Sequence, residues 1–128
     1  MKKRKTINKL IKEADDLFSK YIRKRDNYKC ISCGTYLEPS ESQCGHLITR
    51  RKKAVRWDEY NCHCQCPGCN YKHNFYPHIM TIQVIKKIGQ MQYEDLCSRT
   101  EIRNFRPTRE FLGNIIDKYK LSEGNSNY

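Results

Sequence analysis

Residues 30–70 read CISCGTYLEPSESQCGHLITRRKKAVRWDEYNCHCQCPGCN, and a Cys-x-x-Cys pair lies at each end of this stretch. The four cysteines are Cys30, Cys33, Cys66 and Cys69. Two residues between thiolates let one metal ion take both sulfurs in a tight turn, and two such pairs complete a tetrahedral site. We therefore predict one structural Zn²⁺ per chain, with unligated thiols or disulfides as the alternative.

The segment between the two pairs is longer than in ordinary four-cysteine zinc ribbons, where about 15–20 residues separate them. It has room for a strand, a basic loop and a returning strand. We expect short strands at 45–49 and 61–66, and a helix that begins near Pro67, because proline suits the first turn of a helix. The centre is thus predicted to be strand–strand–helix.

Four cysteines lie outside the two pairs, namely Cys44, Cys62, Cys64 and Cys97. In a strand, the cysteines of residues 62–66 share one face, and Asn61, His63 and Gln65 share the other. We interpret the four as buried thiols first, and as additional metal ligands second.

Helices are expected on both sides of this centre. Apolar residues at three- and four-residue steps predict an amphipathic helix over 7–28, and similar patterns predict C-terminal helices within 78–121. We expect a disordered basic arm at 1–5, a single domain at 6–121 with its core at 30–76, and a frayed tail at 122–128. The predicted class is α+β.

Charge indicates the partner. The 128 residues contain 25 Lys and Arg against 14 Asp and Glu, a formal charge of +11, which favours a polyanion such as nucleic acid. A membrane surface is the rival, but the sequence contains neither an apolar run of spanning length nor the pattern of a signal peptide. We expect a cytoplasmic protein, in whose reducing surroundings cysteines bind metal more readily than they form disulfides.

The order of these motifs resembles the HNH endonuclease motif of the ββα-metal fold. The first Cys-x-x-Cys is followed by His46, then Asn61, then the second Cys-x-x-Cys with Asn70 directly after it. More narrowly, GHLITR, WDEYNCHCQCPGCN and IKKIG resemble the bacteriophage Rap/NinG recombination proteins over roughly residues 14–97. The resemblance implies a small ββα-metal core with a zinc knuckle, flanked by helices.

The resemblance also implies roles for three residues. His46 matches the general base, whose imidazole has an unperturbed pKa near neutrality. Asn61 matches the residue that ties down the connecting loop, and Asn70 matches a ligand of a catalytic divalent cation, Mg²⁺ or Mn²⁺. Taken singly, His46 could be a surface histidine or a zinc ligand, and Asn61 a turn residue.

One position departs from the common HNH pattern. Many HNH enzymes place an aspartate ligand directly before the base, and here that position is Gly45. We consider His63 as the replacement ligand, against the alternative of a buried histidine with satisfied hydrogen bonds. His73 is a further candidate ligand, against the alternative of a residue on a helix surface.

The basic loop directly follows the expected base strand and is assigned to phosphate contacts or, alternatively, to solvent; its residues are Arg50, Arg51, Lys52, Lys53 and Arg56. We predict a metal-dependent DNA endonuclease. The resemblance implies branched, Holliday-junction-type substrates, whose two-fold symmetry favours a homodimer. The main alternative is a non-catalytic zinc-stapled DNA-binding regulator; a protein-interaction adaptor would not need so basic a surface.

Overall fold

The computed structural model describes residues 4–124. Most of the predicted disordered arm and of the predicted frayed tail, residues 1–3 and 125–128, lies outside the described residues. Within the described range, Lys5 forms an ion pair with Glu13, with 2.9 Å between Nζ and Oε2. The last helix continues to Gly124, beyond its predicted end at residue 121.

The elements follow the predicted order. The α-helices are α1 (Ile7–Arg25), α2 (Pro67–Lys72), α3 (Pro77–Ile88), α4 (Gln90–Arg99) and α5 (Arg109–Gly124). The strands are β1 (Gln43–His46) and β2 (Cys62–Gln65), and short 3-10 helices lie at η1 (Pro39–Glu41) and η2 (Lys53–Val55). No helix within residues 4–124 is long and apolar enough to cross a membrane.

Helix α1 ends earlier than the predicted boundary at residue 28. Its start is capped by Thr6, whose hydroxyl accepts a hydrogen bond from the backbone N–H of Lys9. Its end is set by Asn27 and Tyr28, which have φ angles of 53° and 57°. These left-handed conformations cannot continue a right-handed helix. The chain therefore turns at Asp26, and the carboxylate of Asp26 can bind residues beyond α1.

Strands β1 and β2 form an antiparallel pair in which His46 lies opposite Cys62 and Gly45 opposite His63. The first strand lies at 43–46 rather than at the predicted 45–49. It ends at His46 because the backbone N–H of Ile48 is bound by the side chain of Asn61 instead of by a strand neighbour. The second strand lies within its predicted range.

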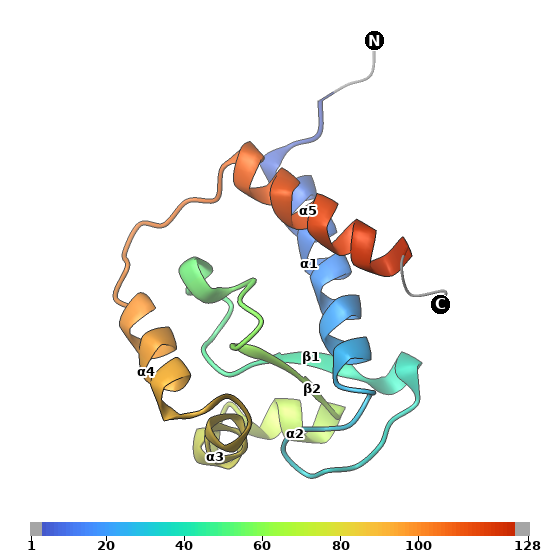
Figure 1. The fold of residues 1–128 in the computed structure, drawn as a ribbon, viewed down its shortest axis with the longest axis vertical. Coiled ribbons are helices and arrows are strands. Elements are labelled where there is room, and N and C mark those ends of the chain that lie inside the picture. The colour runs from blue at the N-terminus through green and yellow to red at the C-terminus, as the bar shows by residue number, and fades with distance from the viewer. Residues whose placement is uncertain (1–3, 125–128) are drawn as a thin grey trace.

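Two hydrophobic clusters flank this hairpin. Helix α5 packs on α1 in the upper part of Figure 1, and their buried residues, including Phe18 and Leu112, form one cluster with Trp57 and Cys62. Helices α2 and α3 lie below the hairpin in the same view. There Leu47 packs on Met80 and Val84 of α3. The hairpin thus sits between two helical layers that fix both of its faces.

Candidate functional site

The two Cys-x-x-Cys pairs come together as predicted. The sulfur atoms of the four cysteines lie within 4.8 Å of one another, and the four residues are Cys30, Cys33, Cys66 and Cys69. The first pair lies in a turn closed by a hydrogen bond from Gly34 N to Cys30 O, where Gly34 takes the positive φ of 78° that suits glycine. Cys66 caps α2, since its sulfur accepts from Cys69 N. This cluster could hold a structural metal ion such as zinc.

The thiols of this cluster differ in their readiness to ionise. Hydrogen bonds with the side chain and backbone of Thr35 lower the pKa of Cys33 to about 6. Burial raises the pKa of Cys69. A cation at the centre would stabilise all four thiolates, because a coordinating thiol is deprotonated outright.

His46 is half-buried at the end of β1, and its ring is held by a backbone carbonyl. Its Nε2 lies 2.9 Å from the carbonyl oxygen of Arg56. A carbonyl only accepts, so Nε2 carries the proton and Nδ1 keeps a free lone pair. Burial lowers the pKa of His46 below its ordinary value, the hydrogen bond to Arg56 partly opposing this. The ring is therefore neutral at physiological pH and able to accept a proton.

Asn61 is fully buried and spans the loop between the strands. Its Oδ1 accepts from the backbone N–H of Ile48 at 2.8 Å. Its Nδ2 donates to the carbonyls of Ile48 and Val55, each at 3.0 Å. Val55 directly precedes Arg56, whose carbonyl holds His46. The amide of Asn61 therefore fixes the segment that orients the imidazole.

Asn70 of α2 and His73, the residue that follows α2, contact the two ends of the segment 43–47, which contains β1. Asn70 Nδ2 donates to the side-chain oxygen of Gln43 at 2.8 Å. His73 Nε2 donates to the carbonyl of Leu47, the residue after His46, at 2.8 Å, and its buried Nδ1 has no partner within residues 4–124. These two residues thus hold both ends of the segment, but no described contact joins Asn70 or His73 to His46.

His63 has surroundings that disfavour a cation. It is completely buried, and its Nε2 lies 2.7 Å from the carbonyl of Tyr60. Its Nδ1 faces two positive groups, Arg25 Nη2 at 3.3 Å and Lys87 Nζ at 3.0 Å. Burial and the charge of Lys87 lower the pKa of His63 to about 4. The replacement-ligand hypothesis for His63 finds no support here, because both nitrogens are engaged and the flanking charges repel a metal ion.

An ion-pair network surrounds His63. Asp26, at the end of α1, pairs with Arg25 at 2.8 Å and with Lys87 at 2.9 Å, and its carboxylate accepts from the backbone N–H of Cys64. Hydrogen bonds from these three residues hold the pKa of Asp26 below its ordinary value in spite of burial. The network joins α1, α3 and β2, so its role is to pack the fold around the hairpin.

The basic loop divides into two parts. The side chains of Arg50, Arg51, Lys52 and Lys53 are exposed, and no described hydrogen bond or ion pair engages them within residues 4–124. Arg56 differs, because its guanidinium binds both carboxylate oxygens of Asp15, at 3.1 and 2.5 Å. Arg56 was also predicted to contact DNA, and in the structure its side chain ties the loop to α1.

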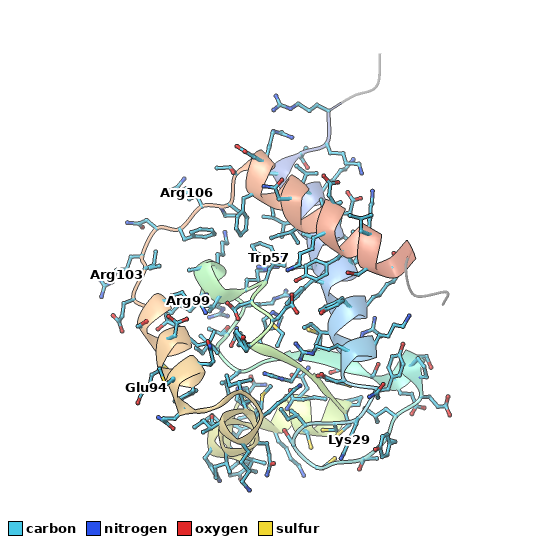
Figure 2. All side chains as sticks on the ribbon, in the orientation of Figure 1. Lys29, Trp57, Glu94, Arg99, Arg103 and Arg106 are labelled. Atoms are coloured by element: carbon cyan, nitrogen blue, oxygen red, sulfur yellow. The ribbon has the colours of Figure 1, made fainter. Side chains whose placement is uncertain are left out.

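Arginine also anchors this region from the other side. Arg99 points inward from α4 (Figure 2), and its guanidinium donates to Asp58 at 2.6 Å. Arg103 and Arg106 lie outside on the connection to α5 in the same view. The loop that carries the carbonyl of Arg56 is therefore braced by ion pairs from α1 and α4.

Sequence reasoning missed several partners in this region. The resemblance identified Asn61 and His46 but not the carbonyl of Arg56, since a backbone atom leaves no signal in a residue pattern. Gln43 was also missed, although its parity with Gly45 on a short strand points it toward α2. The pairing of Asp15 with Arg56 joins distant segments, and no local pattern marks it.

These features define a small mixed α+β protein with a two-stranded sheet and a cysteine cluster able to hold a structural metal ion. The chain belongs to the NinG family: the family described as "Bacteriophage Lambda NinG protein" matches residues 1–124.

Curated NinG proteins of several phages are similar to this chain. Protein ninG of Escherichia phage 933W is 36% identical over 92 residues, which cover 69% of this chain and 44% of that protein. The proteins of Escherichia phage lambda and Salmonella phage P22 are 35% and 37% identical over the same length. The chain thus spans less than half the length of these curated relatives. No solved structure matches it.

Proposed function

We propose that this NinG-family chain is a metal-dependent endonuclease that hydrolyses phosphodiester bonds in DNA, with His46 as the general base. The observation that carries the proposal is the hydrogen bond of 2.9 Å between His46 Nε2 and the carbonyl of Arg56. It leaves Nδ1 unprotonated on a ring whose lowered pKa keeps it neutral. Such a group can take the proton of an attacking water.

Asn61 acts as a positioning residue in this proposal. A general base needs its reactive nitrogen within hydrogen-bond reach of the attacking water, so its ring must not rotate freely. The three hydrogen bonds of the Asn61 amide fix Ile48 and Val55, and thereby the carbonyl that holds the ring. This arrangement supports the role that the resemblance implies for Asn61.

The cation would be held by Asn70. Its Nδ2 is engaged by Gln43, so the amide orientation leaves Oδ1 as an oxygen donor on a half-buried side chain. Mg²⁺ needs only one or two protein oxygens beside water and a phosphate, so the donor set fits. The bound ion would supply charge stabilisation at the phosphate and at the leaving 3′ oxygen. His63 is not part of this proposal.

DNA would be held by the exposed basic loop, residues 50–53. These side chains follow the base strand directly, and phosphate contacts there would place the backbone beside His46. The excess of 25 basic over 14 acidic residues supports a polyanionic partner. The structural ion of the cysteine cluster would be Zn²⁺, one per chain.

The proposed substrate is branched DNA of the Holliday-junction type. Its support is the family membership together with the resemblance to phage recombination proteins. A four-way junction has two equivalent strands to cut, so the active form would be a homodimer.

The test compares the parent protein with His46→Ala and with His78→Ala, which removes an exposed histidine of α3 remote from the proposed chemistry. Each is incubated with supercoiled plasmid and with a four-way junction, in Mg²⁺, Mn²⁺ or EDTA. His46→Ala should lose cleavage by at least about 10²-fold, the lower end of a general-base contribution. It should retain DNA affinity and the zinc ion of the four-cysteine cluster.

Other outcomes would reject the proposal. Cleavage by His46→Ala at the parental rate would remove the base assignment. A parent protein that binds the junction but never cuts it would favour the non-catalytic zinc-stapled regulator. Complete loss of zinc in His46→Ala would show that this histidine is needed for the structural ion of the four-cysteine cluster.

A further inference from the structure

A second group of metal-binding side chains lies on the hairpin, apart from the four-cysteine cluster. Its members are Cys44 and His46 on β1 and Cys62 on β2, whose ligand atoms lie within 4.8 Å of one another. Cys62 is fully buried, while Cys44 and His46 are half-buried. The group shares no residue with the four-cysteine cluster.

We propose that Cys44, His46 and Cys62 form a second metal site that takes a thiophilic divalent cation such as Zn²⁺. Two thiolates and one imidazole are soft ligands, which select zinc over Mg²⁺. Three protein ligands leave a fourth position of a tetrahedral ion open to water. Two thiolates and a neutral ring balance the charge of the ion.

The surroundings suit such an ion. Metal-binding histidines almost always donate their other ring N–H to a carbonyl, carboxylate or water, and here the carbonyl of Arg56 receives Nε2–H. The ligand nitrogen is then Nδ1. The nearby guanidinium of Arg56 is paired with Asp15, so its charge is neutralised and does not repel the cation. The Sγ of Cys62 lies 3.6 Å from the same carbonyl, so both ligands gather at one end of the hairpin.

Occupancy of this site would control the nuclease, a consequence that rests on the proposed function. Nδ1 of His46 is the nitrogen that would accept a proton from water. A zinc ion bound there removes that lone pair, so metal binding and base catalysis exclude each other. Zinc is thus structural at the four-cysteine cluster and inhibitory at the second site.

The experiment counts metal ions directly, using Co²⁺ as the spectroscopic substitute for Zn²⁺. The full chain is titrated with Co²⁺ under reducing conditions, and the thiolate-to-cobalt absorption is followed together with the bound metal per chain. The parent should bind two equivalents. Cys44→Ser and Cys62→Ser should each bind one, while Cys97→Ser, a matched cysteine change on α4, should bind two.

The number of Co²⁺ ions that each variant binds decides whether the second metal site exists. A parent that saturates at one equivalent, or a Cys44→Ser variant that still binds two with parental absorption, overturns the site. Because buried Cys62 also packs in the core, Cys44→Ser serves as the deciding variant, with circular dichroism as the check that it is folded. Neither readout depends on DNA cleavage.

A second arm separates this inference from the proposed function. With a cleaving protein, the second equivalent of Zn²⁺ should reduce the rate at least about tenfold in the parent, and this inhibition should be absent in Cys44→Ser. If no cleavage is ever seen while two Co²⁺ ions bind, the nuclease proposal fails and the metal site stands. If cleavage is seen but only one Co²⁺ ion binds, the metal site fails and the nuclease proposal stands.

Discussion

The side chain of Gln65 lies directly over Gly45, so closely that a Cβ placed on Gly45 would stand 1.8 Å from Gln65 Oε1. Gln65 is fully buried and is held there by a hydrogen bond from its Nε2 to the hydroxyl of Ser32 at 2.9 Å. A side chain at the position before His46 would therefore require Gln65 to move.

Gly45→Ala should destabilise the fold by about 1–3 kcal/mol, the usual cost of forcing an extra group into a packed interior. Gln65→Ala in the same chain should recover part of that loss, because the two side chains would no longer compete for one space. Urea denaturation of the single and double variants measures the coupling. Gly68→Ala is the control, since a Cβ there meets nothing within 4 Å. Strictly additive effects would show that Gln65 does not close the position.

The four-cysteine cluster should determine whether the chain folds. Structural zinc contributes roughly 10–16 kcal/mol in small zinc domains, as much as the entire stability of a typical protein. Cys33→Ser should therefore lose the metal and the cooperative thermal transition. Cys97→Ser, which lies outside the cluster on α4, should keep both. Metal analysis and calorimetry provide the readout, and a metal-free parent with an unchanged melting temperature would contradict the zinc assignment.

Removal of the Asn61 side chain should loosen the loop. Asn61→Ala leaves backbone groups of Ile48 and Val55 without their partner, at about 1–3 kcal/mol for each unsatisfied group. Chemical denaturation should show this loss, and the imidazole resonances of His46 should shift and broaden as its carbonyl partner moves. Asn74→Ala, at an exposed position after α2, is the control. Unaltered His46 resonances in a folded Asn61→Ala variant would remove the positioning role.

Stability should fall as the pH drops below neutrality because of His63. Its pKa is about 4 in the folded protein and returns to about 6.5 on unfolding, so between these values the unfolded chain binds a proton that the folded chain excludes. The free energy of unfolding should therefore decrease by up to about 1.4 kcal/mol for each pH unit. His63→Gln should show a shallower slope in urea denaturation from pH 7 to about 4. His78→Gln, which replaces an exposed histidine of α3, is the control. Equal slopes in the parent and His63→Gln would refute the assignment.

The basic loop should govern how DNA affinity responds to salt. Each phosphate contact adds about 0.9 to the slope of log affinity against log salt concentration. Replacing Arg50, Arg51 and Lys53 together with alanine should lower that slope by roughly 2–3. A triple variant of equal charge loss at Lys9, Arg103 and Arg106 is the control. If both triple variants reduce the slope equally, the charge acts diffusely and the loop is not the contact surface.

Some of these features could be read in the sequence because their causes are local. The four cysteines of the two pairs follow from a spacing of two residues, and helix α3 from its apolar period between Pro77 and Gly89. The predicted boundaries of the helices and strands were less accurate. Helix α1 stopped short because of the left-handed residues Asn27 and Tyr28, which no apolar pattern marks.

The residues of the candidate site show what a sequence pattern does not predict, namely which side chains from distant segments surround a residue. His63 matched a ligand position by strand parity, yet parity says only which face a side chain occupies. That face is covered by Arg25 from α1 and Lys87 from α3, two cations that disfavour a metal ion. Likewise Arg56 matched a run of basic residues, and that pattern gave no sign of its pairing with Asp15 of α1.

The sequence by itself determined the cysteine cluster, the order of the helices and strands, and the family, because these depend on residue type and spacing along a few turns of chain. Only the tertiary structure decided which carbonyl holds His46, that Gln65 lies over Gly45, and that Cys44 and Cys62 converge on the same imidazole. Those relationships are set by the way α1, α3 and the loop 47–61 pack around the hairpin. Packing joins residues that are distant in sequence, and only the folded chain brings them within contact distance.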